Sequence, residues 1–124
     1  SGYLIQGTQL LSGNKSVASN WNFGPEENGC ISVKNILELY NKYHKIGGII
    51  YYKETIKKHE SSFLMLDCSK AKEKLNWRPV WNLEKTIEVT ANWYSDYLNK
   101  RLVNTESDLM KYISDAKKQK VVWA

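Results

Sequence analysis

The segment Leu66–Pro79, with the sequence LDCSKAKEKLNWRP, constrains the fold of this chain more than any other stretch. Asp67 follows a short apolar run, and its carboxylate can accept hydrogen bonds from the first N–H groups of a helix and complement the helix dipole. Ala71 and Leu75 are four residues apart and therefore share one helix face. Pro79 cannot continue a helix. The segment predicts a strand that ends at Asp67, followed by a short helix that ends before Pro79.

The rest of the chain predicts further helices joined by short strands. A helical period of apolar residues covers 3–11 and stops at Ser12-Gly13-Asn14. Ser32 is a candidate N-cap for a helix with Val33, Ile36, Leu37 and Tyr40 facing inward, broken by Gly47-Gly48. A long helix follows Asn82, and Thr105 with Asp108 resembles a capping box. The β-branched and aromatic runs predict strands at 17–23, 49–52 and 63–66. We expect one domain, residues 1–124, with a small mixed α/β fold.

Charge and composition argue against several classes of partner. The net charge is +5, but only Arg78 and Arg101 of the 18 basic residues are arginine, and the lysines are dispersed. Nucleic-acid binding is therefore not expected, because bidentate recognition of bases and phosphates relies on arginine. No apolar run approaches the length of a membrane span, so no membrane partner is expected. Cys30 and Cys68 have no disulfide or zinc spacing, which favours reduced thiols in a cytoplasmic protein without a metal site.

Several motifs occur in the order found in one enzyme family. They are Ser1-Gly2-Tyr3-Leu4, Trp21-Asn22-Phe23-Gly24-Pro25, His59-Glu60, Leu66–Pro79 and Trp81-Asn82-Leu83-Glu84. Together they resemble the C-terminal part of extended short-chain dehydrogenases/reductases that act on nucleotide sugars, and above all the 4,6-dehydratases among them. The family's glycine-rich dinucleotide loop and its Tyr-x-x-x-Lys catalytic pair are absent from these 124 residues. The resemblance implies a substrate-binding lobe, inactive by itself, without the Rossmann domain of its parent.

The resemblance also implies the ligands and assembly of the parent enzyme. NAD would be bound by the absent Rossmann domain, and no catalytic or cofactor-binding residue is expected in this chain. The substrate would be a nucleotide sugar, CDP-glucose first, with dTDP- and UDP-sugars as alternatives. The parent would be a homo-oligomer that supplies deoxysugars for surface polysaccharides. Two other interpretations remain: a free-standing nucleotide-sugar-binding module, and a basic tryptophan-rich domain that binds nucleic acid or protein.

The loop Lys57-Lys58-His59-Glu60 is the best candidate for ligand contact, because it combines cations, an imidazole and a carboxylate between two predicted strands. The matching loop of the family carries an arginine on the pyrophosphate and an acid on the ribose. The resemblance places Lys57 and Glu60 at these positions, with His59 sharing the phosphate contact. The alternative is a solvated charged loop.

Asn22 is the fourth candidate binding residue. It lies in the segment that resembles the family's Asn-x-Gly strand end, which passes close to the bound nucleotide. An amide can both donate and accept hydrogen bonds at a base or sugar edge. Equally, Asn22 could satisfy backbone groups near the Gly24-Pro25 turn. By contrast, His44 is expected to end a helix, and Trp77, Trp81 and Trp93 are expected to fill the core.

Overall fold

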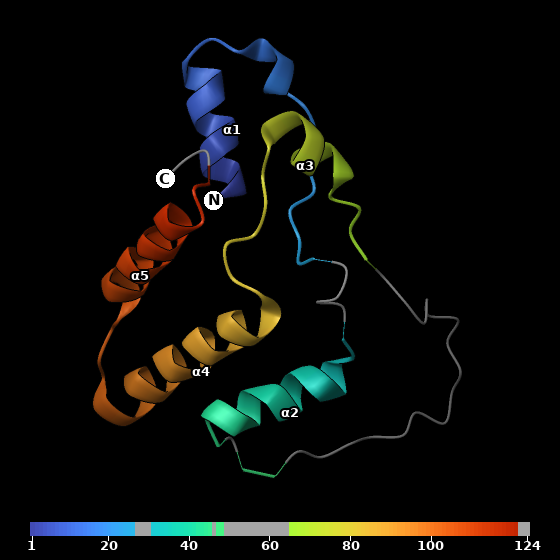
Figure 1. The fold of residues 1–124 in the computed structure, drawn as a ribbon. Coiled ribbons are helices and arrows are strands. Elements are labelled where there is room, and N and C mark those ends of the chain that lie inside the picture. Colours follow the sequence, from blue (N-terminus) through green and yellow to red (C-terminus); the bar gives the residue numbers. More distant parts are fainter. Residues whose placement is uncertain (27–30, 46, 49–64, 122–124) are drawn as a thin grey trace.

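The computed structural model describes residues 1–26, 31–45, 47–48 and 65–121. All regular elements within these residues are helical (Figure 1). The α-helices are α1 (Gly2–Leu11), α2 (Val33–Tyr43), α3 (Ser69–Leu75), α4 (Leu83–Lys100) and α5 (Thr105–Lys118), and η1 (Lys15–Val17) is a 3-10 turn. The predicted helices at 3–11, after Ser32 and after Asn82 are thus confirmed.

The main core lies where α1, η1 and α3 meet, near the N-terminus (Figure 1). Its buried side chains come from the start of α1, from η1, and from α3 with the residues on either side of it: Ile5, Val17, Cys68, Ala71, Leu75 and Trp77. Trp21 and Phe23 pack against this cluster. Ala71 and Leu75 share the buried face of α3, as the sequence predicts.

Helices α2 and α4 pack against each other, and each begins at a polar cap. The Ser32 hydroxyl accepts a hydrogen bond from the N–H of Asn35 at 3.1 Å, and the Asn82 side chain accepts one from Lys85 at 2.8 Å. Such bonds satisfy N–H groups that have no partner within a helix. The expectation that Val33 faces inward is wrong, because its side chain lies 73% exposed in the first turn. His44 is the C-cap of α2, as expected.

Helix α5 returns toward the N-terminus (Figure 1) and is held by polar contacts of aromatic side chains. The indole N–H of Trp81 donates to Asp115 at 3.0 Å, and that of Trp93 donates to the Thr105 hydroxyl at 3.0 Å. Both tryptophans are half-buried, whereas Trp77 is a core residue as predicted. The predicted capping box is wrong, because Asn104 is the N-cap and makes no side-chain cap bond.

The α/β prediction is not met by the described residues, which contain helices and no strand. Val17 ends η1, and 18–26 and 65–68 are extended or irregular rather than paired. The predicted strand at 49–52 and the first half of that at 63–66 lie outside the described residues. A strand exists only through backbone hydrogen bonds to a neighbour. The apolar runs that suggest strands here have no such neighbour within the part of the chain that is described. Whether residues 1–124 form a single domain stays a prediction.

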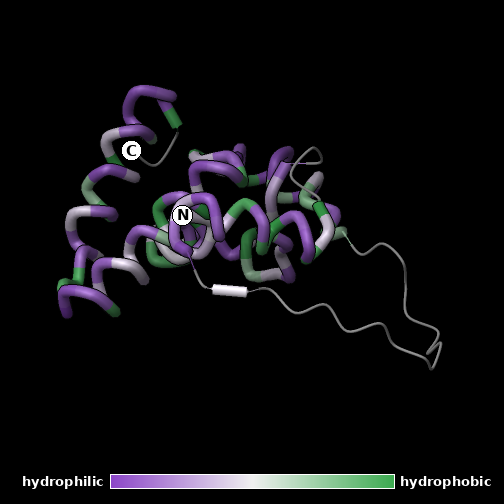
Figure 2. The backbone as a smooth tube through the Cα atoms, turned by 90° about the horizontal axis from the view of Figure 1, so that it is seen from below, coloured by the Kyte–Doolittle hydropathy of each residue, from purple (hydrophilic) through white to green (hydrophobic). Residues whose placement is uncertain are grey.

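Apolar residues are spread along the helices between polar ones (Figure 2). Within the described residues, no helix has the length and hydropathy needed to cross a membrane.

The contact between α2 and α4 predicts a dependence of stability on pH. Glu84 accepts hydrogen bonds at 3.0 Å from both Lys42 and Tyr43. The bond from Lys42 is the main cause that lowers the pKa of Glu84 from its ordinary 4.5, and it raises the pKa of Lys42. Because the carboxylate is favoured by the fold, its contribution is present above pH 4.5 and is lost as the pH falls through the lowered value.

We therefore expect Glu84→Gln to lower the melting temperature slightly at neutral pH and to have no effect in strong acid. The measurement is thermal unfolding by far-UV circular dichroism at about pH 7 and about pH 2. Equal effects of the substitution at both pH values would contradict the role of the Glu84 charge.

Candidate functional site

Segments 19–26 and 65–72, which contain the Trp21–Pro25 motif and the first half of the Leu66–Pro79 motif, lie against each other at the start of α3. The side-chain amide of Asn22 donates to the carbonyl oxygen of Asp67 at 3.1 Å. The backbone of Gly24 lies next to Cys68, and a Cβ added at Gly24 would lie 3.4 Å from the Cys68 sulfur. Glu26 forms an ion pair with Lys72 at 3.1 Å. The chain thus joins two motifs that are more than forty residues apart in sequence.

Lys70 makes further contacts between segments 19–26 and 65–72. Its ammonium group donates to the Ser19 hydroxyl at 2.6 Å and to the carbonyl of Asn20 at 2.9 Å. It also lies 4.6 Å from the centre of the Trp21 ring, a distance typical of a cation–π contact. Lys70 is exposed and Lys72 is half-buried, and both contact the segment before Glu26 or Glu26 itself. Charge pattern alone could not reveal these contacts, because their partners lie far away in the sequence.

Asp67 orders the start of α3, in agreement with its predicted capping role. One carboxylate oxygen accepts a hydrogen bond from the backbone N–H of Ser69 at 2.9 Å. Hydrogen bonds from Ser69 lower the pKa of Asp67. The residue immediately before the helix is Cys68, whose side chain makes no cap bond. Asp67 therefore acts from one position further upstream, and its role is structural.

The predicted binding residues differ in how the structure places them. Asn22 is exposed, and its amide nitrogen donates to the backbone carbonyl of Asp67 rather than to a group of the Gly24-Pro25 turn. Lys57, His59 and Glu60 lie outside the described residues. Contact of these four residues with a ligand stays a prediction.

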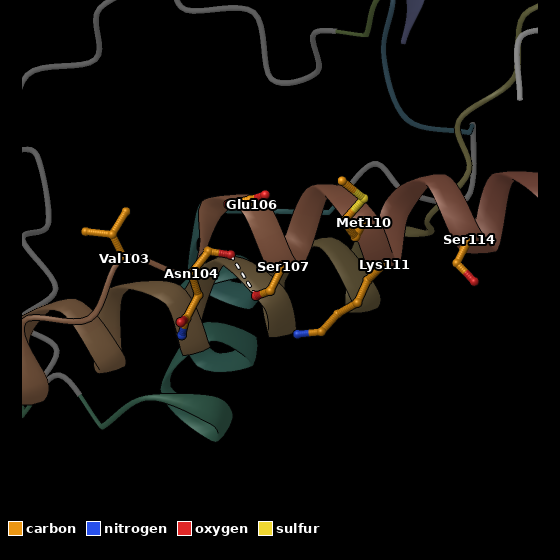
Figure 3. A pocket seen from close by; sticks show the side chains of 7 residues that line it. All are labelled: Val103, Asn104, Glu106, Ser107, Met110, Lys111 and Ser114. Carbon is orange, nitrogen blue, oxygen red and sulfur yellow. Dashed lines mark hydrogen bonds between the residues drawn. The ribbon is translucent and has the colours of Figure 1, made fainter.

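One surface pocket borders the contact between segments 19–26 and 65–72, and a larger hollow lies elsewhere, on α5. The pocket, of about 440 Å³, lies on the 19–21 side of this contact and is lined by Lys70, Lys74 and polar side chains of the α1–η1 region. A shallow hollow of about 700 Å³ runs along α5, from Val103 to Ser114 (Figure 3). It contains a hydrogen bond of 2.9 Å from the Ser107 hydroxyl to the Asn104 carbonyl and none of the predicted site residues. Among the described residues, no group of three His, Cys, Asp or Glu side chains could hold a metal ion.

Comparison with known proteins identifies a distant relative of a defined class. No protein-family profile matches the chain. The chain is distantly similar to a nucleotide-sugar dehydratase. This relative is the CDP-glucose 4,6-dehydratase of Salmonella typhimurium (strain LT2), with 26% identity over 116 residues. The match covers 92% of this chain but only 32% of the relative, so the chain spans about a third of the relative's length.

Proposed function

We propose that this chain is the C-terminal substrate-binding part of an enzyme that resembles CDP-glucose 4,6-dehydratase. The observation that carries the proposal is the similarity to the Salmonella enzyme, which extends over 92% of the chain. A similarity confined to one motif could reflect a common helix cap. A similarity along nearly the whole chain supports shared ancestry and a related role.

The contact between the two motif segments supports a binding role for this region. The bond from Asn22 to Asp67 holds the Trp21–Pro25 segment against the start of α3. Lys70 and Lys72 add two further ties between the same segments. Rigidly held segments can present polar groups to a ligand at a lower entropic cost than free loops. In our proposal, Lys57, His59 and Glu60 contact the diphosphate and ribose of the nucleotide from the chain that precedes Met65.

The chemistry of the reaction would lie in the remaining part of the parent enzyme. The seven glycines of this chain do not form a dinucleotide-binding loop, and no tyrosine has a lysine four residues later. The residues present therefore do not fit NAD. We expect this chain by itself neither to bind NAD nor to convert CDP-glucose.

Titration of the isotope-labelled chain with CDP, followed by NMR, tests the proposed binding. We expect shifts of the amide signals of residues 57–60 with a dissociation constant near the millimolar range, about 4 kcal/mol, because only one wall of the site is present. Glu60→Gln should weaken the binding of cytidine more than that of inorganic phosphate. Lys57→Ala should have the opposite effect, because its charge is assigned to the phosphates.

Two controls make this titration decisive. Lys45→Ala removes an exposed positive charge elsewhere and should leave the affinity for CDP unchanged. Parallel titrations with dTDP and UDP test the alternative substrates, and tighter binding of either would replace CDP in the proposal. Shifts confined to the lysines at 117–120 would indicate nonspecific electrostatics and would reject the proposed site.

A further inference from the structure

Helix α1 exposes an apolar surface that nothing in the described chain covers. Tyr3 is 80% exposed, Leu4 67% and Leu11 92%, whereas Ile5 on the opposite side is 5% exposed. The helix contains no charged residue. Surface helices normally place polar and charged residues on the side away from the core, whereas in α1 the polar Gln6 and Gln9 are half-buried and the exposed side is mainly apolar.

Four of the five exposed side chains of α1 are apolar and lie on one stripe, and the fifth, Thr8, lies beside Leu4 at its edge. At 100° per residue, the side chains at positions 3, 7 and 11 follow one another along the helix, flanked by Leu4 and Leu10. Contiguous apolar patches on a protein surface typically mark contacts with another protein surface. We refer to Tyr3, Leu4, Gly7, Leu10 and Leu11 as the outer face of α1.

Gly7, at the centre of the outer face, gives the second indication. It lies inside the helix, where glycine is less favourable than alanine. An added Cβ at Gly7 would meet no other atom within 4 Å, and Gly7 has no positive φ that would require glycine. The described chain therefore gives no reason for a glycine here. Close approach of another backbone to the helix would give one.

We propose that the outer face of α1 is the surface on which the dinucleotide-binding part of the parent enzyme docks, with a closely packed element that crosses α1 at Gly7. This inference rests on the proposed function. The match covers only 32% of the Salmonella relative, so a part about twice as long as this chain has no counterpart here. That length suffices for a complete domain. The outer face has no charge and only the exposed Thr8 at its edge is polar, which is typical of a permanent contact within one protein rather than of a transient one.

Hydrogen exchange measured by mass spectrometry tests this assignment. The complete product of the gene that encodes this chain is compared with residues 1–124 alone. We expect the amides of α1 to exchange at least tenfold more slowly in the complete protein, because docking buries the helix. Exchange in α4 should be similar in the two proteins.

Substitutions on the outer face sharpen the test because their effects should differ between the two proteins. Gly7→Leu fills open space in residues 1–124 and should leave the melting temperature unchanged or higher. In the complete protein the same side chain should clash with the docked element and lower the melting temperature by several degrees. Leu98→Ser, on α4, removes a leucine that is 55% exposed and serves as the matched control, with equal effects in both proteins.

Three results would overturn the proposal: equal exchange of α1 in both proteins, a gene product without a further domain, or a dimer of residues 1–124 that Gly7→Leu abolishes. The last result would assign the outer face to a second copy of the chain. The titration with CDP is read separately. Slow exchange of α1 without CDP binding would support the docking surface and reject the proposed substrate. CDP binding with fast exchange of α1 would support the proposed substrate and reject the docking surface.

Discussion

Trp77→Ala is expected to remove a large part of the stability of this chain and to lower its urea midpoint strongly. The Trp77 side chain is 6% exposed and packs edge-to-face on Phe23, with ring centres 5.0 Å apart. Its indole N–H also donates to the Ser1 hydroxyl at 3.0 Å. Removal of a buried tryptophan typically costs about 3–5 kcal/mol. Since a small domain is stable by only about 5–15 kcal/mol in total, this loss takes up much of the stability.

Urea unfolding followed by far-UV circular dichroism measures the effect without depending on tryptophan fluorescence. Trp93→Ala is the matched control, because Trp93 is half-buried and its N–H bonds to the Thr105 hydroxyl. We expect a much smaller shift of the urea midpoint for the control. Equal shifts for the two substitutions would show that the cluster around α1 and α3 is not the main source of stability.

The helix boundaries could be predicted because their signals are local. Ser32 and Asn82 each accept a hydrogen bond from an N–H three residues later, so a short window of sequence contains both partners. The Thr105 prediction failed by one residue, because Asn104 is the N-cap and Thr105 is the first residue of α5. The Thr105 hydroxyl accepts a bond from Trp93, twelve residues away, and this contact does not show in the local pattern.

Strands and ligand sites depend on distant partners, and there the sequence was less informative. The run at 17–23 has strand-like residues, but it lies against the 65–68 segment through the Asn22 side chain rather than a backbone ladder. The role of Lys70 likewise depends on Ser19 and Trp21, about fifty residues earlier. Only the resemblance to a known family linked Asn22 with Lys57, His59 and Glu60. Their shared role in binding stays a prediction.

Gly2→Ala is expected to destabilise the chain strongly, although alanine is the better helix former. An added Cβ at Gly2 would overlap the ring of Phe23. That ring cannot move aside freely, because it is held edge-to-face between Tyr3, at 5.4 Å, and Trp77, at 5.0 Å. Overpacking of this kind typically costs about 1–3 kcal/mol. We therefore expect a melting temperature several degrees below that of the native chain.

Gly7→Ala provides a control of opposite sign within the same helix. At Gly7 an added Cβ meets nothing within 4 Å, so alanine should stabilise residues 1–124 by up to about 1 kcal/mol through its higher helix propensity. Thermal unfolding gives the melting temperatures of both variants, which are compared with that of the native chain. If Gly2→Ala also raised the melting temperature, Phe23 would have to lie away from the start of α1, and the core that joins α1 to the candidate site would need to be revised. A lower melting temperature for Gly2→Ala alone would show that this first turn is fixed by its contact with Phe23, the neighbour of Asn22.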